Sequence, residues 1–320
     1  MQLKIKFLKW SAGIPVAMLN EKTAEKMGAH ILDRILIKKG LKEIVTIVDT
    51  IGNLVKENEI AVSSEIKEIL DLNSGDKLEV SIAQPPKSMT FIKDKLNNKT
   101  LSKNQINEII QDLADNSLSE SEIAMFISAT YKNGMNFKET IFLIEAFLIT
   151  GNKLKFNNKF VVDKHSIGGI AGNRTTPIVV SICAAAGLVF PKSSSRAITS
   201  AAGTSDVIET LANVDFSVNE IKQIIKKTNA CLVWGGAMRM VPVDEKIIKI
   251  EKQLVIDSEP LLLSSIMSKK LAVGSNYILI DIPYGKNAKV NLSEAIKLKQ
   301  KFKKIGKYFN PIITNTQYFF

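Results

Sequence analysis

The sequence predicts a multidomain protein of mixed α/β and α+β class, with a small β-rich domain, a helical domain and an α/β domain in that order. The first part alternates apolar and polar residues, the second shows capped segments of helical period, and the third alternates short apolar strands with helices. A chain of 320 residues also exceeds one ordinary compact domain, so two or three domains are expected.

Residues 1–84 are predicted to form a small barrel-like β domain. From Leu3 to Phe7 apolar residues alternate with lysines, which is the period of a half-buried strand. Pro85 and Pro86 then indicate a linker, because proline continues neither a strand ladder nor a helix interior. Further strands are expected at 44–48 and 78–82, and short helices at 20–28 and 64–70.

Residues 85–159 are predicted to form a helical domain. Three segments have capping-box spacing, in which a glutamate or glutamine follows the capping residue by three positions. Each segment precedes apolar residues at helical spacing. The pairs are Ser102 with Gln105, Ser119 with Glu122, and Asn136 with Glu139.

Residues 160–320 are predicted to form an α/β domain with a mainly parallel central sheet. Strands and helices alternate along this segment, which is typical of a sheet covered by helices. Strands are expected at 160–162, 188–190, 231–234 and 277–282, and helices at 176–186, 205–212, 218–228 and 261–272.

The formal net charge of +11 favours an anionic partner. The lysines are spread along the chain instead of forming one block, and aromatic residues make up only 7%, so we expect no nucleic-acid partner. Two cysteines and two histidines make a zinc site improbable, and we expect no metal.

No membrane partner is expected either, because the longest apolar stretch is too short for a bilayer, which needs about 20 residues. The first residues do not form the apolar block of a signal peptide. A cytoplasmic location follows as the expectation.

Two segments have the composition of anion-binding loops. The first, 163–175, is rich in glycine and contains Lys164, Ser166 and Thr175 as donors. Each segment follows a predicted strand and opens a helix, where backbone N–H groups and the helix dipole favour an anion. The second, 191–206, surrounds Arg196 with hydroxyl groups, a set that fits phosphate. The alternative for the first segment is a tight strand–helix turn with solvated polar residues.

Together these segments resemble the signatures of the thymidine and pyrimidine-nucleoside phosphorylase family. Further matching segments follow in family order and spacing, and the match covers roughly residues 85–320. The matching segments are 164–169, 195–198, 202–209, 234–237, Asp257 and 264–270.

The extra N-terminal β domain resembles that of the archaeal AMP phosphorylases within this family. Where pyrimidine phosphorylases carry a base-contacting arginine, this chain has Ile250. Loss of that bidentate partner disfavours a pyrimidine nucleoside such as thymidine. In the family, the region that ends here at Gln317 leads into a further C-terminal domain, which we expect to be absent from this chain.

The resemblance implies a nucleoside phosphorylase/phosphoribosyltransferase-like fold and the catabolic reaction AMP plus phosphate giving adenine plus ribose 1,5-bisphosphate, with CMP and UMP as further substrates. AMP and phosphate are the implied partners. Inorganic phosphate is a co-substrate, and no metal or organic cofactor is implied. A homo-oligomer, a dimer or larger, is expected.

The resemblance also implies the site residues. Asp257 corresponds to the proton donor, and His165 lies beside the sugar and base in the related enzymes. The positions implied to bind AMP are Gly169, Ser195, Arg196, Ala197, Ile198, Thr199, Ser200, Thr204, Ser265, Lys269 and Lys289. The positions implied to bind phosphate are Lys164, Ser166, Thr175, Ser194 and Thr204.

Other interpretations stay open at this point. Asp257 has the place of an N-cap for the helix near Leu261, and Lys269 and Lys270 have the pattern of a solvated helix face. For the whole chain, the alternatives are a pyrimidine-nucleoside phosphorylase, a phosphoribosyltransferase of the related fold, and a truncated, non-catalytic nucleotide-binding protein.

Overall fold

The computed structural model describes residues 1–8, 10–12, 15–168, 175–194, 196, 202–236 and 240–319. The chain divides into two compact units. One comprises Met1–Met89 with Asp112–Ser119, and the other comprises Thr90–Gln111 with Glu120–Phe320.

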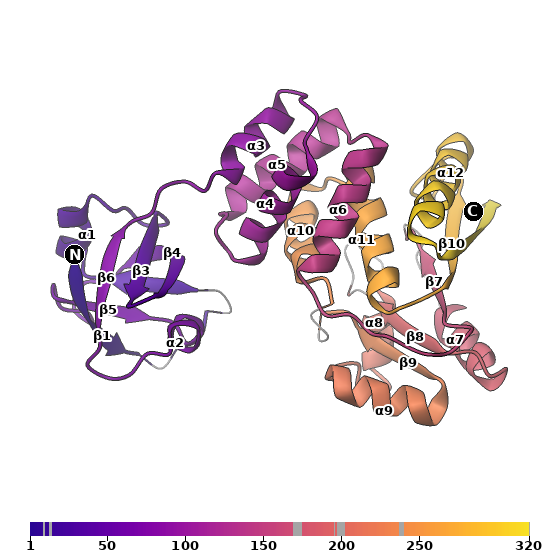
Figure 1. The fold of residues 1–320 in the computed structure, drawn as a ribbon, viewed down its shortest axis with the longest axis horizontal. Helices are drawn as coiled ribbons and strands as arrows, with labels where there is room; N and C mark the ends of the chain where they lie inside the picture. The colour runs from indigo at the N-terminus through magenta and orange to yellow at the C-terminus, as the bar shows by residue number, and fades with distance from the viewer. Residues whose placement is uncertain are drawn as a thin grey trace. The chain divides into compact units, whose positions relative to one another are not determined.

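A closed barrel forms most of the first unit (Figure 1). Its strands are neighbours in the order β1-β5-β2-β4-β3-β6, and β6 returns to pair with β1. Alternate residues such as Ile35 and Ile37 are fully buried, as the period of two requires. The elements are β1 Gln2–Phe7, β2 Val16–Leu19, α1 Glu21–Met27, β3 Arg34–Lys39, β4 Lys42–Thr50, β5 Glu59–Val62, α2 Ser64–Leu70 and β6 Lys77–Ile82.

Four helices follow the barrel. The predicted capping box at Asn136 and Glu139 is confirmed, because each residue's side chain accepts a hydrogen bond from the other's backbone N–H. Glu139 is also buried against Lys95, with Nζ to Oε1 at 2.9 Å, which ties the first of these helices to the last. The helices are α3 Ser88–Leu96, α4 Lys103–Ala114, α5 Glu120–Asn133 and α6 Phe137–Ile149.

The remaining residues form an α/β arrangement in which the described strand pairs are parallel, so the predicted fold class is confirmed. One sheet has the order β11-β10-β7 and a second pairs β8 with β9, and a bridge between Val161 and Val189 joins them. Helices α10 and α11 pack against the earlier helices, α10 on α5 and α11 on both α5 and α6. The elements are β7 Val162–Ser166, α7 Thr175–Ala185, β8 Phe190–Ser194, α8 Thr204–Glu209, α9 Val218–Thr228, β9 Ala230–Trp234, α10 Pro242–Leu254, α11 Glu259–Ala272, β10 Tyr277–Tyr284, α12 Leu292–Phe309 and β11 Ile312–Phe319.

Two predicted strand boundaries are wrong, and both strands carry residues of the candidate site. The strand expected at 160–162 runs instead from Val162 to Ser166, and the strand expected at 188–190 runs from Phe190 to Ser194. Their charged and hydroxyl residues looked like loop residues in the sequence. The charged residues can lie in buried strands because distant residues neutralise them: Lys270 pairs with Asp163, and Asp281 pairs with Lys164.

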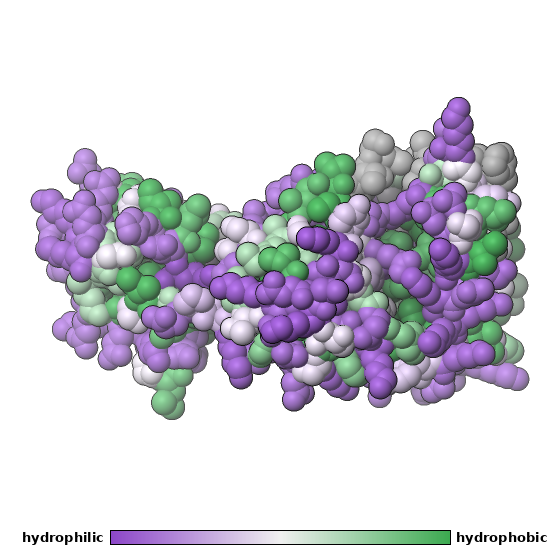
Figure 2. All heavy atoms as spheres, turned by 90° about the horizontal axis from the view of Figure 1, so that it is seen from above, coloured by the Kyte–Doolittle hydropathy of each residue, from purple (hydrophilic) through white to green (hydrophobic). Residues whose placement is uncertain are grey.

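On the face shown in Figure 2, hydrophilic residues predominate and hydrophobic residues appear between them in small groups. Among the described residues, no helix is both long and apolar enough to cross a membrane.

Candidate functional site

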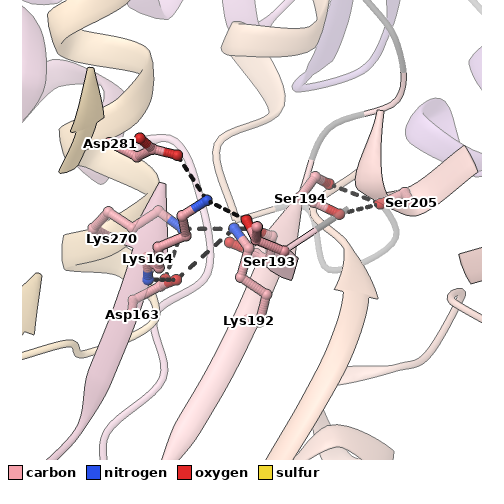
Figure 3. Close-up of polar contacts among 9 residues, drawn as sticks. Asp163, Lys164, Lys192, Ser193, Ser194, Ser205, Lys270 and Asp281 are labelled. Atoms are coloured by element: carbon pink, nitrogen blue, oxygen red, sulfur yellow. Dashed lines mark hydrogen bonds and ion pairs between the residues drawn. The ribbon is translucent and has the colours of Figure 1, made fainter. Parts of the chain in front are cut away.

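A cluster of buried lysines and aspartates joins strands β7, β8 and β10 to helix α11 (Figure 3). Its centre is Lys270 on α11, whose Nζ lies 2.6 Å from Oδ2 of Asp163 on β7; both side chains are fully buried. Lys192 on β8 lies 3.8 Å from the other oxygen of the same carboxylate and donates to the carbonyl of Ser193. These contacts connect β7, β8 and α11.

The predicted phosphate-binding Lys164 belongs to the same cluster. Its Nζ lies 2.9 Å from Oδ2 of Asp281 on β10 and donates to the hydroxyl of Thr175 at 3.2 Å. Thr175 is the first residue of α7, so two of the predicted phosphate ligands meet at that helix N-terminus. Ser166 ends β7, and its hydroxyl accepts from the N–H of Gly168 at 3.4 Å.

Burial and crowding of positive charge set the protonation of this region. The pKa of His165 is lowered well below its usual value, first by burial and then by Lys270 and Lys192 with two further lysines. The pKa of Lys192 is also lowered well below its usual value, chiefly by burial and next by the charge of Lys270. His165 therefore remains neutral at physiological pH, and its Nδ1 finds no hydrogen-bond partner among the described residues.

The second predicted anion segment converges on the N-terminus of α8. The hydroxyl groups of Ser194, at the end of β8, and Ser205 are 2.5 Å apart. Thr204 is the first residue of α8, and Asp206 accepts from the N–H of Gly203 in the first turn. Hydroxyl groups and a helix N-terminus thus lie together, which is the chemistry expected of an anion site.

Arg196 follows Ser194 by two positions, and its partly exposed side chain contacts Glu209 and Trp234. Its guanidinium forms two hydrogen bonds with the carboxylate of Glu209, at 2.5 and 2.7 Å, and lies 4.6 Å from the ring centre of Trp234. The bidentate pair and the aromatic contact fix the position of the guanidinium.

Lys269 and Lys270 are buried, so the solvated-face interpretation is wrong. Lys269 Nζ lies 2.5 Å from Oδ2 of Asp244, which is buried on α10, and 3.2 Å from the hydroxyl of Ser265 one helical turn earlier. Two residues predicted to contact the nucleotide therefore occupy one face of α11, and Asp244 neutralises the lysine.

A cavity of about 220 Å³ lies between the end of β8 and helices α10 and α11. Ser194, Arg196 and Lys269 line it together with Trp234 and Glu245. Burial raises the pKa of the Glu245 carboxyl. Gly236 also lines the cavity, and a Cβ at Gly236 would lie 2.0 Å from Oε1 of Glu245, so any larger residue there would displace the carboxyl.

The predicted proton donor Asp257 forms an ion pair with the predicted nucleotide-binding Lys289. The alternative that Asp257 is an N-cap is wrong, because Ser258 and not Asp257 occupies the N-cap position of α11. Glu251 lies nearby: burial raises its pKa to about 7, and the charges of Asp257 and Asp244 act in the same direction. The charge of Asp257 therefore acts on the Glu251 carboxyl.

Six predicted positions lie outside the part of the chain that the structure describes, so they stay predictions. They are Gly169, Ser195, Ala197, Ile198, Thr199 and Ser200.

Two family models match the chain and cover most of the second unit. A model of a glycosyl transferase family's helical bundle domain matches residues 89–151, and a model of that family's a/b domain matches residues 158–297. The chain belongs to this glycosyl transferase family. The two matched segments coincide with the four helices and with the sheets that carry the lysine cluster.

Relatives within the family are similar over nearly the whole chain. The AMP phosphorylase of Pyrococcus furiosus is 43% identical over 98% of this chain, and that of Thermococcus kodakarensis is 42% identical over 98%. The AMP phosphorylase of Natronomonas pharaonis is 41% identical over 96%. The chain spans 63% of the length of the first two relatives and 61% of the third.

A solved structure supports the fold alone. Anthranilate phosphoribosyltransferase from Thermus thermophilus superimposes with a TM-score of 0.56 at 15% identity, covering 67% of this chain and 63% of that one. The expected phosphoribosyltransferase-like fold is confirmed.

The sequence interpretation missed several residues of the site. Asp281 holds the predicted phosphate ligand Lys164, and Asp163 pairs with Lys192 and Lys270, yet Asp163, Lys192 and Asp281 were not singled out. Only Asp281 left a signal in the sequence, an acidic residue inside an otherwise apolar strand, since a buried charge requires a partner. In the described ranges, no group of three or more His, Cys, Asp or Glu side chains is placed to hold a metal ion.

Proposed function

We propose that the chain catalyses phosphorolysis of nucleoside 5′-monophosphates, in which AMP and phosphate give adenine and ribose 1,5-bisphosphate. CMP and UMP are further substrates in this proposal. The observation that carries it is that a helix N-terminus with hydroxyl groups lies beside each of two parallel strands: Lys164 of β7 contacts Thr175 at the start of α7, and Ser194 of β8 contacts Ser205 in the first turn of α8. The similarity to proteins named AMP phosphorylase supports the choice of substrate.

The chemistry requires such an arrangement. A phosphate oxygen forms a bond to C1′ of the ribose while the bond from C1′ to the base nitrogen breaks, and C1′ gains positive charge between these events. Two anions must therefore be held close together, which demands cationic and N–H donors fixed in advance. The lysine cluster is fixed in this sense, because Lys164 and Lys270 are each held by a buried aspartate.

In this proposal Lys164, Ser166, Thr175, Ser194 and Thr204 bind the attacking phosphate. Lys269, which lines the cavity, and Ser265, which accepts a hydrogen bond from Lys269, contact the nucleotide. His165, neutral because of burial and the surrounding lysines, hydrogen-bonds near the sugar without adding charge.

In this proposal the Asp257–Lys289 ion pair supplies the proton that the departing base takes up: the Asp257 carboxyl passes it to the base and receives it from the Lys289 ammonium group. The exposed side of Asp257 allows it to reach a ligand. Ile250 is buried in α10, which supports a substrate other than a pyrimidine nucleoside recognised by an arginine at that position.

No metal or organic cofactor takes part in the proposed reaction, and the protein works in the cytoplasm as a homo-oligomer of two or more copies. Sedimentation equilibrium of the purified chain tests the oligomer, and a mass of one chain at micromolar concentration would contradict it.

The test of the function is base release by the purified chain. AMP, CMP, UMP, adenosine and thymidine are each incubated with and without phosphate, and free base is separated by chromatography. The proposal expects adenine from AMP only when phosphate is present, and little from adenosine, because adenosine lacks the 5′-phosphate. Thymine release would identify a pyrimidine-nucleoside phosphorylase, and AMP binding without any release would identify a non-catalytic nucleotide-binding protein.

A further inference from the structure

The turn that carries Asp257 has a strained backbone. It connects α10 to α11 through residues 255–258, and Val255 adopts the left-handed conformation with φ 54° and ψ 38°. A β-branched residue is a genuine outlier there, because its Cβ crowds the following carbonyl. The Val255 side chain is 91% exposed, so packing of that side chain does not enforce the conformation.

Backbone and side-chain contacts from Glu251 hold this turn from both ends. The carbonyl oxygen of Glu251 accepts from the N–H groups of Val255 and Ile256, the second at 3.1 Å. Its side-chain Oε1 accepts from the N–H of Ser258 at 3.4 Å. Glu251 therefore contacts the residues before and after Asp257.

The Ser258 contact matters because Ser258 begins α11. Ser258 is fully buried, and its own side chain does not cap the helix. The N–H of Ser258 would otherwise be one of the free donors at a helix start, and the Glu251 carboxyl satisfies it. Loss of that acceptor leaves a buried donor unsatisfied and releases one end of a strained turn.

The charged groups that act on Glu251 include residues of the candidate site. The carboxyl is influenced by Asp244 on its own helix, by Asp257 in the turn and by Lys289 after β10. Burial and the two aspartates raise its pKa to about 7, while the Ser258 hydrogen bond and Lys289 act in the opposite direction. Glu251 thus changes charge near neutral pH beside the predicted proton donor.

We propose that Glu251 is a positioning residue that clamps the 255–258 turn and so aims the Asp257 carboxyl at the departing base. The inference rests on the proposed function for the role of Asp257. The clamp itself is a property of the free protein, so it is testable whether or not the chain turns over AMP.

The first experiment measures backbone amide hydrogen exchange in the ligand-free protein. Glu251→Ala should raise the exchange rate of the Ser258 and Asp257 amides at least tenfold, whereas Glu251→Gln, which keeps an acceptor oxygen, should change it less than threefold. Gln253→Ala, two residues further along α10 and exposed, is the matched control and should leave the rates unchanged. Equal exchange in Glu251→Ala and the wild type would overturn the clamp.

The second experiment separates proton donation from general damage. It compares AMP with the 5-phosphate of p-nitrophenyl riboside, whose nitrophenolate leaves without a proton. Glu251→Ala should lower kcat for AMP at least tenfold with KM changed less than threefold. Its kcat for the nitrophenyl substrate should change less than threefold. Asp257→Asn should show the same pattern on the two substrates. Glu251→Gln should retain most of the rate and lose an inflection of the pH profile near 7.

Equal loss of rate on both substrates would overturn the positioning role, and so would an AMP rate within twofold of the wild type in Glu251→Ala. Absence of AMP phosphorolysis in the wild type would instead contradict the proposed function, while the exchange experiment would still decide the clamp.

Discussion

Replacing Lys270 by methionine should destabilise the protein substantially, because it leaves Asp163 charged in the interior. Both side chains of this 2.6 Å ion pair are fully buried. Removal of one partner of such a pair typically costs about 3–5 kcal/mol of unfolding free energy. Here Lys192 lies 3.8 Å from the same carboxylate, and removal of Lys270 takes away a charge that lowers the pKa of Lys192, so Lys192 remains as a partner for Asp163. The expected loss is therefore at the lower end, about 3 kcal/mol.

Urea denaturation followed by circular dichroism measures this loss, and a double-mutant cycle isolates the pair. Asp163→Asn combined with Lys270→Met should recover about 2 kcal/mol relative to the sum of the single changes. Lys249→Met is the matched control, because Lys249 and Glu120 form an exposed pair and its loss should cost less than about 0.5 kcal/mol. A loss below about 1 kcal/mol for Lys270→Met, or strict additivity in the cycle, would refute this reasoning.

Three further predictions concern the turn, the pH dependence and metal removal. Val255→Asn should raise the unfolding free energy by about 1 kcal/mol, because asparagine tolerates the left-handed region; an unchanged or lower melting temperature would show that the turn is not strained. Since the pKa of Glu251 is about 7 when folded against 4.5 as the ordinary value, the folded state binds more protons between these values and stability falls as pH rises through them. Glu251→Gln should remove that fall, a difference of about 1–3 kcal/mol between pH 5 and 8 in urea titrations, and parallel profiles would contradict it. Dialysis against EDTA should leave the phosphate-dependent rate within twofold, and a larger loss that added Mg²⁺ restores would contradict the cofactor-free proposal.

Local patterns in the sequence predicted much of the fold. The helix expected at 218–228 has those bounds, and Ser217 and Glu220 form a capping box at its start. The capping pair at Asn136 and Glu139 is likewise confirmed. Such features depend on residues three or four positions apart, which a single sequence displays directly.

Features that depend on distant partners were not predicted. β11 has polar residues at its centre and no apolar alternation, and it was not predicted as a strand because its pairing with β10 is not visible in its own residues. β7 carries Asp163, whose partner Lys270 is 107 positions away, and Lys164, whose partner is Asp281 on β10. Charged residues can be assigned to a buried strand only when their partners are known, because an unpaired buried charge is prohibitively costly.

The candidate site was found largely through family resemblance, and the structure added the residues that support it. Lys164 contacts Thr175, and Lys269 is buried against Asp244, whereas the contact of Glu251 with Ser258 has no signal in the sequence. A glutamate late in a helix normally indicates only a solvated surface. Its role depends on a chain reversal that brings Ser258 back to it.

Phosphorus NMR of the purified chain with AMP and inorganic phosphate tests the central claim most directly. The account predicts that the inorganic phosphate signal decreases as an anomeric phosphate ester appears, in amounts equal to the adenine released. Release of adenine without loss of inorganic phosphate would show hydrolysis instead, and would contradict the account.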